Sequence, residues 1–127
     1  MSATINTKRV GSAEAISKNG DSLWIQIRLN DTPNLEWIQC FRDPKSFEPN
    51  EAHPSNVRFN TDNMIEFQST VGGLKNNIRW MDKYLEQANV AYNAKKAKEL
   101  ADKKRKEDLE AEKEEELKKI NESIRDL

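Results

Sequence analysis

The chain has 127 residues, of which 34% are charged and 35% hydrophobic, and its formal net charge is -1. This length permits one domain, or one small domain with an appendage, and the balanced charge argues against a polycationic nucleic-acid binder. A single cysteine and a single histidine exclude a disulfide framework, a thiolate-rich zinc site and a multi-histidine metal site. We therefore expect no metal and no cofactor.

No apolar stretch approaches the roughly 20 residues that a membrane helix needs, and the first ten residues have no apolar core of a secretory signal. These features predict a protein that makes no membrane contact. With one cysteine, we expect a reducing, cytoplasmic setting.

The first expected element is a β-hairpin. Leu23–Leu29 alternates apolar and polar side chains, which is typical of a strand with one buried face. A three-residue loop ending at Gly20, in the left-handed conformation, would connect it to a partner strand over about Arg9–Ser17. The predicted cross-strand pairs are Ala15 with Leu23 and Ala13 with Ile25.

Residues 33–42 are compatible with two structures. Thr32 followed by Pro33 resembles a helix start, and Trp37 and Phe41 would then share one buried face. The same stretch is also rich in strand formers. We favour a short helix and expect a surface loop over residues 43–56, which hold three prolines.

A second β-hairpin is predicted from Val57–Asn60 and Met64–Gln68. A three-residue loop, Thr61–Asn63, with Asn63 in the left-handed conformation, keeps the apolar residues of both strands on one face. The predicted pairs are Phe59 with Ile65, Val57 with Phe67, and Arg58 with Glu66.

Residues 74–127 contain no glycine and no proline and are rich in helix formers, so we expect one long helix. Its first part carries an apolar stripe: Leu74, Ile78, Met81, Leu85, Ala88 and Tyr92. The stripe is interrupted between Ala101 and Leu109, where no apolar residue occurs, and we expect charged pairs four residues apart to stabilise the helix there. The predicted pairs are Glu99–Lys103, Asp102–Lys106, Lys104–Asp108, Glu114–Lys118 and Glu115–Lys119.

These elements predict an α+β fold of order ββαββα, with two hairpins in one antiparallel sheet covered by the start of the long helix. The covered sheet face would consist of Ile25, Ile27, Val57, Phe59, Ile65 and Phe67. Trp80 and Tyr84 would flank that contact. We place an α+β globular domain at residues 1–94 and a charged helical extension at residues 95–127.

The length of the helix limits its course. Fifty-four residues span roughly 80 Å, whereas a 94-residue domain is only about 30 Å across. The helix therefore projects from its domain, breaks near residues 101–109 into a hairpin, or pairs with another chain.

Little in the sequence points to catalysis. We expect His53 to be a solvent-exposed loop residue and Cys40 a buried, inert thiol, because neither has the neighbours that general-base or thiolate chemistry needs. Gly72–Gly73 is best explained as a tight strand-to-helix turn, and Lys103–Lys106 as part of a salt-bridged helix face. We expect a protein that is not an enzyme.

The expected function is therefore protein–protein interaction. An apolar stripe reappears at the end of the helix, where it would bind a partner helix or a second copy of the chain. It consists of Leu117, Ile120, Ile124 and Leu127. The alternative is a single-stranded nucleic-acid-binding module. It would use the open sheet face, where Trp24 and Arg28 could stack and hold a nucleotide.

Overall fold

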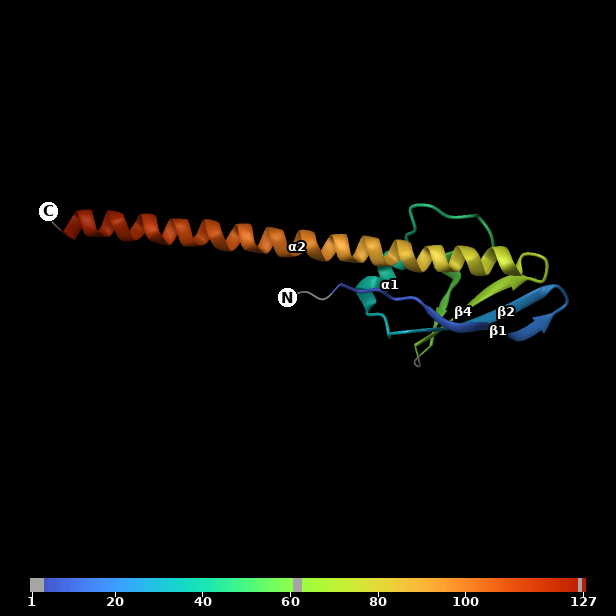
Figure 1. Ribbon diagram of the computed structural model, residues 1–127. Coiled ribbons are helices and arrows are strands. Elements are labelled where there is room, and N and C mark those ends of the chain that lie inside the picture. The colour runs from blue at the N-terminus through green and yellow to red at the C-terminus, as the bar shows by residue number, and fades with distance from the viewer. Residues whose placement is uncertain (1–3, 61–62, 126) are drawn as a thin grey trace. The chain divides into compact units, whose positions relative to one another are not determined.

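The computed structural model describes residues 4–60, 63–125 and 127, and it confirms the predicted α+β fold of order ββαββα (Figure 1). The elements are β1 (Arg9–Asn19), β2 (Ser22–Leu29), α1 (Leu35–Phe41), the 3-10 turn η1 (Pro54–Asn56), β3 (Arg58–Phe59), β4 (Met64–Thr70) and α2 (Leu74–Arg125). The four strands form one antiparallel sheet in the order β1-β2-β4-β3.

The chain divides into two compact units, Met1–Asn93 and Ala94–Leu127. We call the described residues of the first unit the head and those of the second unit the tail. The two are described separately below.

The β1–β2 hairpin has a different register from the predicted one. Gly20 is left-handed, as expected, with φ of 64°. The loop has only two residues, however, because Asn19 pairs with Ser22, and a glycine at its first position suits such a short turn. A bulge between Ala15 and Ser17 then sets Ala15 opposite Ile25, so both predicted pairs are wrong.

The second hairpin follows its prediction closely. Arg58 pairs with Glu66 and Phe59 with Ile65, and Asn63 is left-handed with φ of 52°. Thr61 and Asp62 of the predicted loop lie outside the described residues. Val57 precedes β3 rather than belonging to it, but its side chain is buried as expected.

Residues 35–41 form helix α1, which confirms helix over strand. The predicted cap, Thr32, is wrong: Asn34 caps the helix, and its Oδ1 accepts a hydrogen bond of 2.9 Å from the Trp37 backbone amide. Asn34 also donates from Nδ2 to the Tyr92 hydroxyl at 3.0 Å, a bond to α2 that a shorter threonine side chain would not replace.

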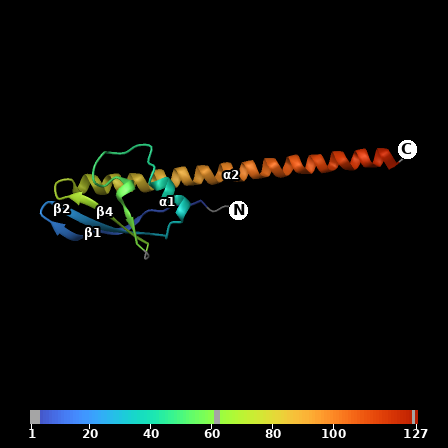
Figure 2. The same ribbon diagram turned by 180° about the vertical axis from the view of Figure 1, so that it is seen from behind.

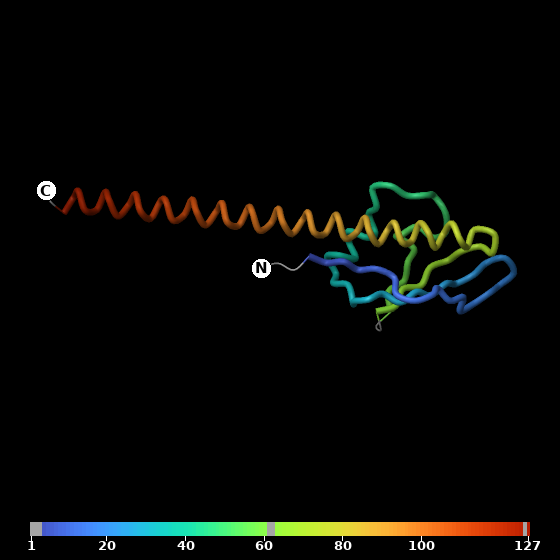
Figure 3. Tube along the Cα trace, in the orientation of Figure 1, coloured from blue at the N-terminus to red at the C-terminus, as the bar shows by residue number. Residues whose placement is uncertain are grey.

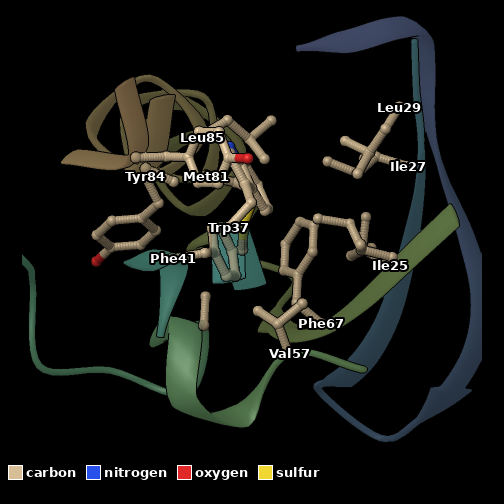
Figure 4. Close-up of a cluster of buried hydrophobic side chains, with 14 of the residues drawn as sticks. Ile25, Ile27, Leu29, Trp37, Phe41, Val57, Phe67, Met81, Tyr84 and Leu85 are labelled. Atoms are coloured by element: carbon tan, nitrogen blue, oxygen red, sulfur yellow. The ribbon is translucent and has the colours of Figure 1, made fainter. Parts of the chain in front are cut away.

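The core lies between the sheet and the two helices (Figure 4). Apolar residues of β2 and β4 face Trp37 and Phe41 of α1, whose rings stack at 5.4 Å. Burial of such side chains contributes about 25 cal/mol per Å² of apolar surface. The expected sheet face is buried here, apart from Phe59, which is half-buried against the core.

Helix α2 covers that core with more residues than the predicted stripe. Met81, Leu85 and Ala88 are buried as expected, whereas Leu74 and Ile78 are only half-buried. Tyr84 was expected to flank the contact, but it is 1% exposed and belongs to the core. Burial raises the pKa of its phenol, and its hydroxyl points away from the apolar cluster toward the loop before η1 (Figure 4).

Two asparagines of α2 hold the N-terminal segment of the head in place. Asn89 accepts from the Thr7 backbone amide at 3.0 Å and donates to the Thr7 carbonyl at 2.8 Å. Asn93, one turn later, makes the same pair of bonds with Ile5. The side chains of α2 thus take the place of a neighbouring strand for a segment that runs past α1 into β1 (Figure 3).

The opposite edge of the N-terminal segment that precedes β1 is also hydrogen-bonded. Asn30, just after β2, accepts from the Lys8 amide and donates to the Asn6 carbonyl. Further along, Arg9 forms a bidentate ion pair with Asp82 of α2, and this hydrogen bonding raises the pKa of Arg9. The segment is therefore fixed on both sides through its backbone.

Polar side chains of α2 also order the long loop between α1 and β3 (Figure 2). Gln87 bonds to backbone atoms of Lys45 and Ser46, and the Tyr84 hydroxyl accepts from the Glu48 amide. The buried Asn77 contacts the side chains of Asn50, Glu51 and Ser69. The loop thereby has partners for backbone groups that no strand supplies.

We predict that Asn89→Ala destabilises the head by roughly 3 kcal/mol, because it leaves the Thr7 amide, the Thr7 carbonyl and the Trp37 indole N–H without their buried partner. Urea denaturation measures this loss. The neighbouring Val90→Ala, at an exposed position, should change the free energy of unfolding by less than about 0.5 kcal/mol. Equal effects of the two variants would contradict the role of Asn89.

Thr7→Val is the matched control within the same contact. The Thr7 hydroxyl is buried and has no hydrogen-bond partner among the described residues, while its backbone carries the bonds to Asn89. Removing the hydroxyl should therefore leave the urea midpoint unchanged or raise it. A large destabilisation would show that the side chain, not the backbone, is recognised.

Candidate interaction surfaces

The tail is helical from Ala94 to Arg125, and α2 is continuous through Ala101–Leu109. Of the three courses that the length of the helix left open, the structure therefore excludes the break into a hairpin. From Ala97 onward every described residue is exposed. Beyond Lys96, the described part of the tail thus buries no side chain within its own unit.

The charged pairs of the tail differ from those predicted. Among the described residues, only Glu115–Lys119 of the five expected pairs comes within 4.0 Å, while Glu99 pairs instead with Lys96 at 3.2 Å. An exposed ion pair is only slightly more stable than its two charged groups in water, so the charged side chains of the tail remain hydrated. Their charges are therefore available to a partner.

An apolar face runs along the second half of the tail. Leu117, Ile120 and Ile124 each keep more than half of their surface exposed, and Leu127 is fully exposed. At 3.6 residues per turn, Leu117, Ile120 and Ile124 fall with Leu109 within about 80° of the helix circumference, and Leu127 follows the end of α2 at Arg125. A stripe of this kind suits contact with a partner helix.

The open face of the sheet carries the second predicted surface. Trp24 lies there half-buried, but the basic side chain on its ring is Arg58, whose guanidinium carbon is 4.0 Å from the ring centroid. Arg28, the other residue predicted on this face, is exposed and lies opposite Met64 in the β2–β4 register. Sequence reasoning missed Arg58 because it comes from β3, two strands away in the sheet.

The charges of this face are balanced. The register places Glu14, Gln26, Glu66 and Arg58 in one row across the four strands. An adjoining hollow of ≈ 370 Å³ is lined by residues of β1, β2 and β4, including Glu14 and Arg28. Two carboxylates thus offset two guanidiniums, which weakens any attraction for a phosphate backbone.

The remaining candidates have structural explanations. His53 is half-buried rather than solvent-exposed: its Nδ1 accepts from the Ser55 amide at the start of η1, and its ring meets Phe47 edge-on. Cys40 is half-buried, not buried. The Gly73 amide donates to the Thr70 hydroxyl, and a Cβ on Gly73 would lie 2.9 Å from that oxygen, so this turn needs glycine.

No protein-family model, curated protein or solved structure matches the chain. Within the described ranges, no group of three or more His, Cys, Asp or Glu side chains is placed to hold a metal ion. None of the described helices combines the length and the apolar character needed to cross a membrane.

We predict that the full chain shows no saturable binding to a labelled single-stranded oligonucleotide at low salt. The accessible ring of Trp24 is covered by Arg58, and Glu14 and Glu66 oppose the nearby cations. Fluorescence anisotropy tests this. Saturable binding that weakens with salt and is lost in Trp24→Ala would restore the nucleic-acid alternative.

Proposed function

We propose that the chain is a non-enzymatic protein–protein interaction module that binds a partner, or a second copy of itself, through its C-terminal helix. The observation that carries this proposal is the exposed apolar face of the tail, formed by Leu117, Ile120, Ile124 and Leu127. A helix with no buried face of its own is stabilised most effectively by packing against another surface. The proposal includes a coiled-coil-like contact and a cytoplasmic setting.

The head supports this proposal by what its polar groups already do. Its buried asparagines bond to other groups of the head itself: Asn89 to the Thr7 backbone and Asn77 to the Ser69 hydroxyl. The Arg9 guanidinium is likewise engaged by Asp82. These groups serve the fold and have no reactive geometry that would suggest a substrate. In this proposal the head is a stable platform, and recognition lies in the helix.

The apolar face covers only five positions, counting Leu109, in a tail of 34 residues. A complete interface usually buries about 800 Å² per partner. The charged side chains that surround these residues therefore have to contribute to recognition, and they determine which partners are compatible.

We predict that the native chain in extracts of its own cells elutes as a species larger than 14.7 kDa, and that a Leu117→Glu/Ile124→Glu chain elutes at its monomer size. Both substitutions place a carboxylate on the apolar face, where a partner would have to desolvate it. Size-exclusion chromatography followed by immunodetection makes the measurement.

The matched control is Glu115→Gln/Lys119→Gln, which removes the exposed ion pair without altering the apolar face. Its elution should follow that of the native chain. A native chain that elutes as a monomer in the extract would refute the proposed function, whatever the behaviour of the variants.

A further inference from the structure

The charges of the tail are segregated along its length. Residues 95–106 contain seven basic and two acidic side chains, a net charge of +5, whereas residues 107–116 contain one basic and seven acidic side chains, a net charge of -6. The neutrality of the tail therefore results from two opposite blocks. A blocked pattern of this kind makes the orientation of any helical partner matter.

An exposed seam runs through both blocks. It consists of Ala94, Ala97, Ala101, Arg105, Leu109, Lys113, Leu117, Ile120, Ile124 and Leu127, all exposed in the structure. Its ten positions cover residues 94–127 in nine steps, a mean spacing of about 3.7 residues, close to the 3.67 of an 11-residue repeat. The first three side chains of the seam are small alanines, the last four are bulky apolar side chains, and Leu109 lies near the middle.

We propose that the tail pairs antiparallel with the tail of a second copy of this chain, in a register that centres on Leu109. This inference rests on the proposed function and names its partner. In this register Leu109 meets Leu109, Ala101 meets Leu117, and Ala94 meets Ile124. Small side chains of one helix thus receive the bulky side chains of the other at both ends.

The charges favour the same arrangement. Lys103, Lys104 and Lys106 of one copy lie opposite Glu115, Glu114 and Glu112 of the other. The exception is within the seam, where Arg105 of one copy meets the like-charged Lys113 of the other. Their long aliphatic stems can cover the seam while their charged ends reach neighbouring carboxylates such as Asp102 and Glu116.

A parallel, in-register pair would make the opposite contacts. It would bring the basic block of one copy against the basic block of the other, and the acidic block against the acidic block. Like charges directly opposite each other destabilise a helix pair. A second copy in antiparallel orientation therefore satisfies both the apolar seam and the charge blocks.

Light scattering and cysteine cross-linking of the full chain test this proposal. The purified chain should reach twice its monomer mass of 14.7 kDa as concentration rises. In a Cys40→Ser background, a mixture of Ala101→Cys chains and Leu117→Cys chains should form a disulfide-linked dimer under mild oxidation. Leu117→Cys chains alone should remain largely unlinked.

Efficient linkage of Leu117→Cys chains to each other, with little linkage in the mixture, would show a parallel pair and overturn the inference. A purified chain that stays at 14.7 kDa would overturn it as well. The proposed function has its own test, because such a monomer could still form a larger complex in the cell extract. The two failures are therefore distinguishable.

Discussion

The contact between the Asn89 carboxamide and the backbone of Thr7 is the interaction on which the head depends most. A carboxamide has a donor and an acceptor in the spacing of a peptide group, so it can pair with an extended backbone as a neighbouring strand would. Asn89 does this while its Oδ1 also accepts from the Trp37 indole N–H at 2.9 Å. One side chain therefore joins the N-terminal segment, α1 and α2.

Side chains of α2 also bond to the backbone of other segments that have no neighbouring strand. Asn93 pairs with Ile5, and Gln87 pairs with the loop that precedes η1. Buried backbone groups without partners would each cost about 1–3 kcal/mol, a large part of the stability of a small domain. These contacts explain how a sheet with a two-residue β3 and a long loop can form a defined core.

The fold was predictable from the sequence where one physical pattern dominated. Alternation defined β2, and the common apolar face of Phe59 and Ile65 fixed the second hairpin register. The predicted register of the first hairpin was wrong because the chain forms a two-residue turn at Gly20 and not a three-residue loop, and a bulge between Ala15 and Ser17 then shifts the register again. Such local choices depend on packing that the sequence pattern does not encode.

The polar contacts of α2 and the covering of Trp24 by Arg58 were not predicted. The signal for the first was present, since four asparagines lie between residues 74 and 93 of a helix otherwise rich in good helix formers. The contact between Arg58 and Trp24 joins residues that are 34 positions apart in the sequence, and only the strand order brings them together. The candidate apolar face of the tail was visible in the sequence because it lies on one regular helix.

The first part of helix α2 thus fastens the head through buried polar side chains, and we propose that its second part offers an exposed seam to a second copy. Amide hydrogen exchange along α2 tests this division directly. Residues 77–93 should exchange slowly at every protein concentration, whereas residues 98–125 should exchange fast when dilute and slow as the chain associates. Equal protection along the whole helix, independent of concentration, would contradict it.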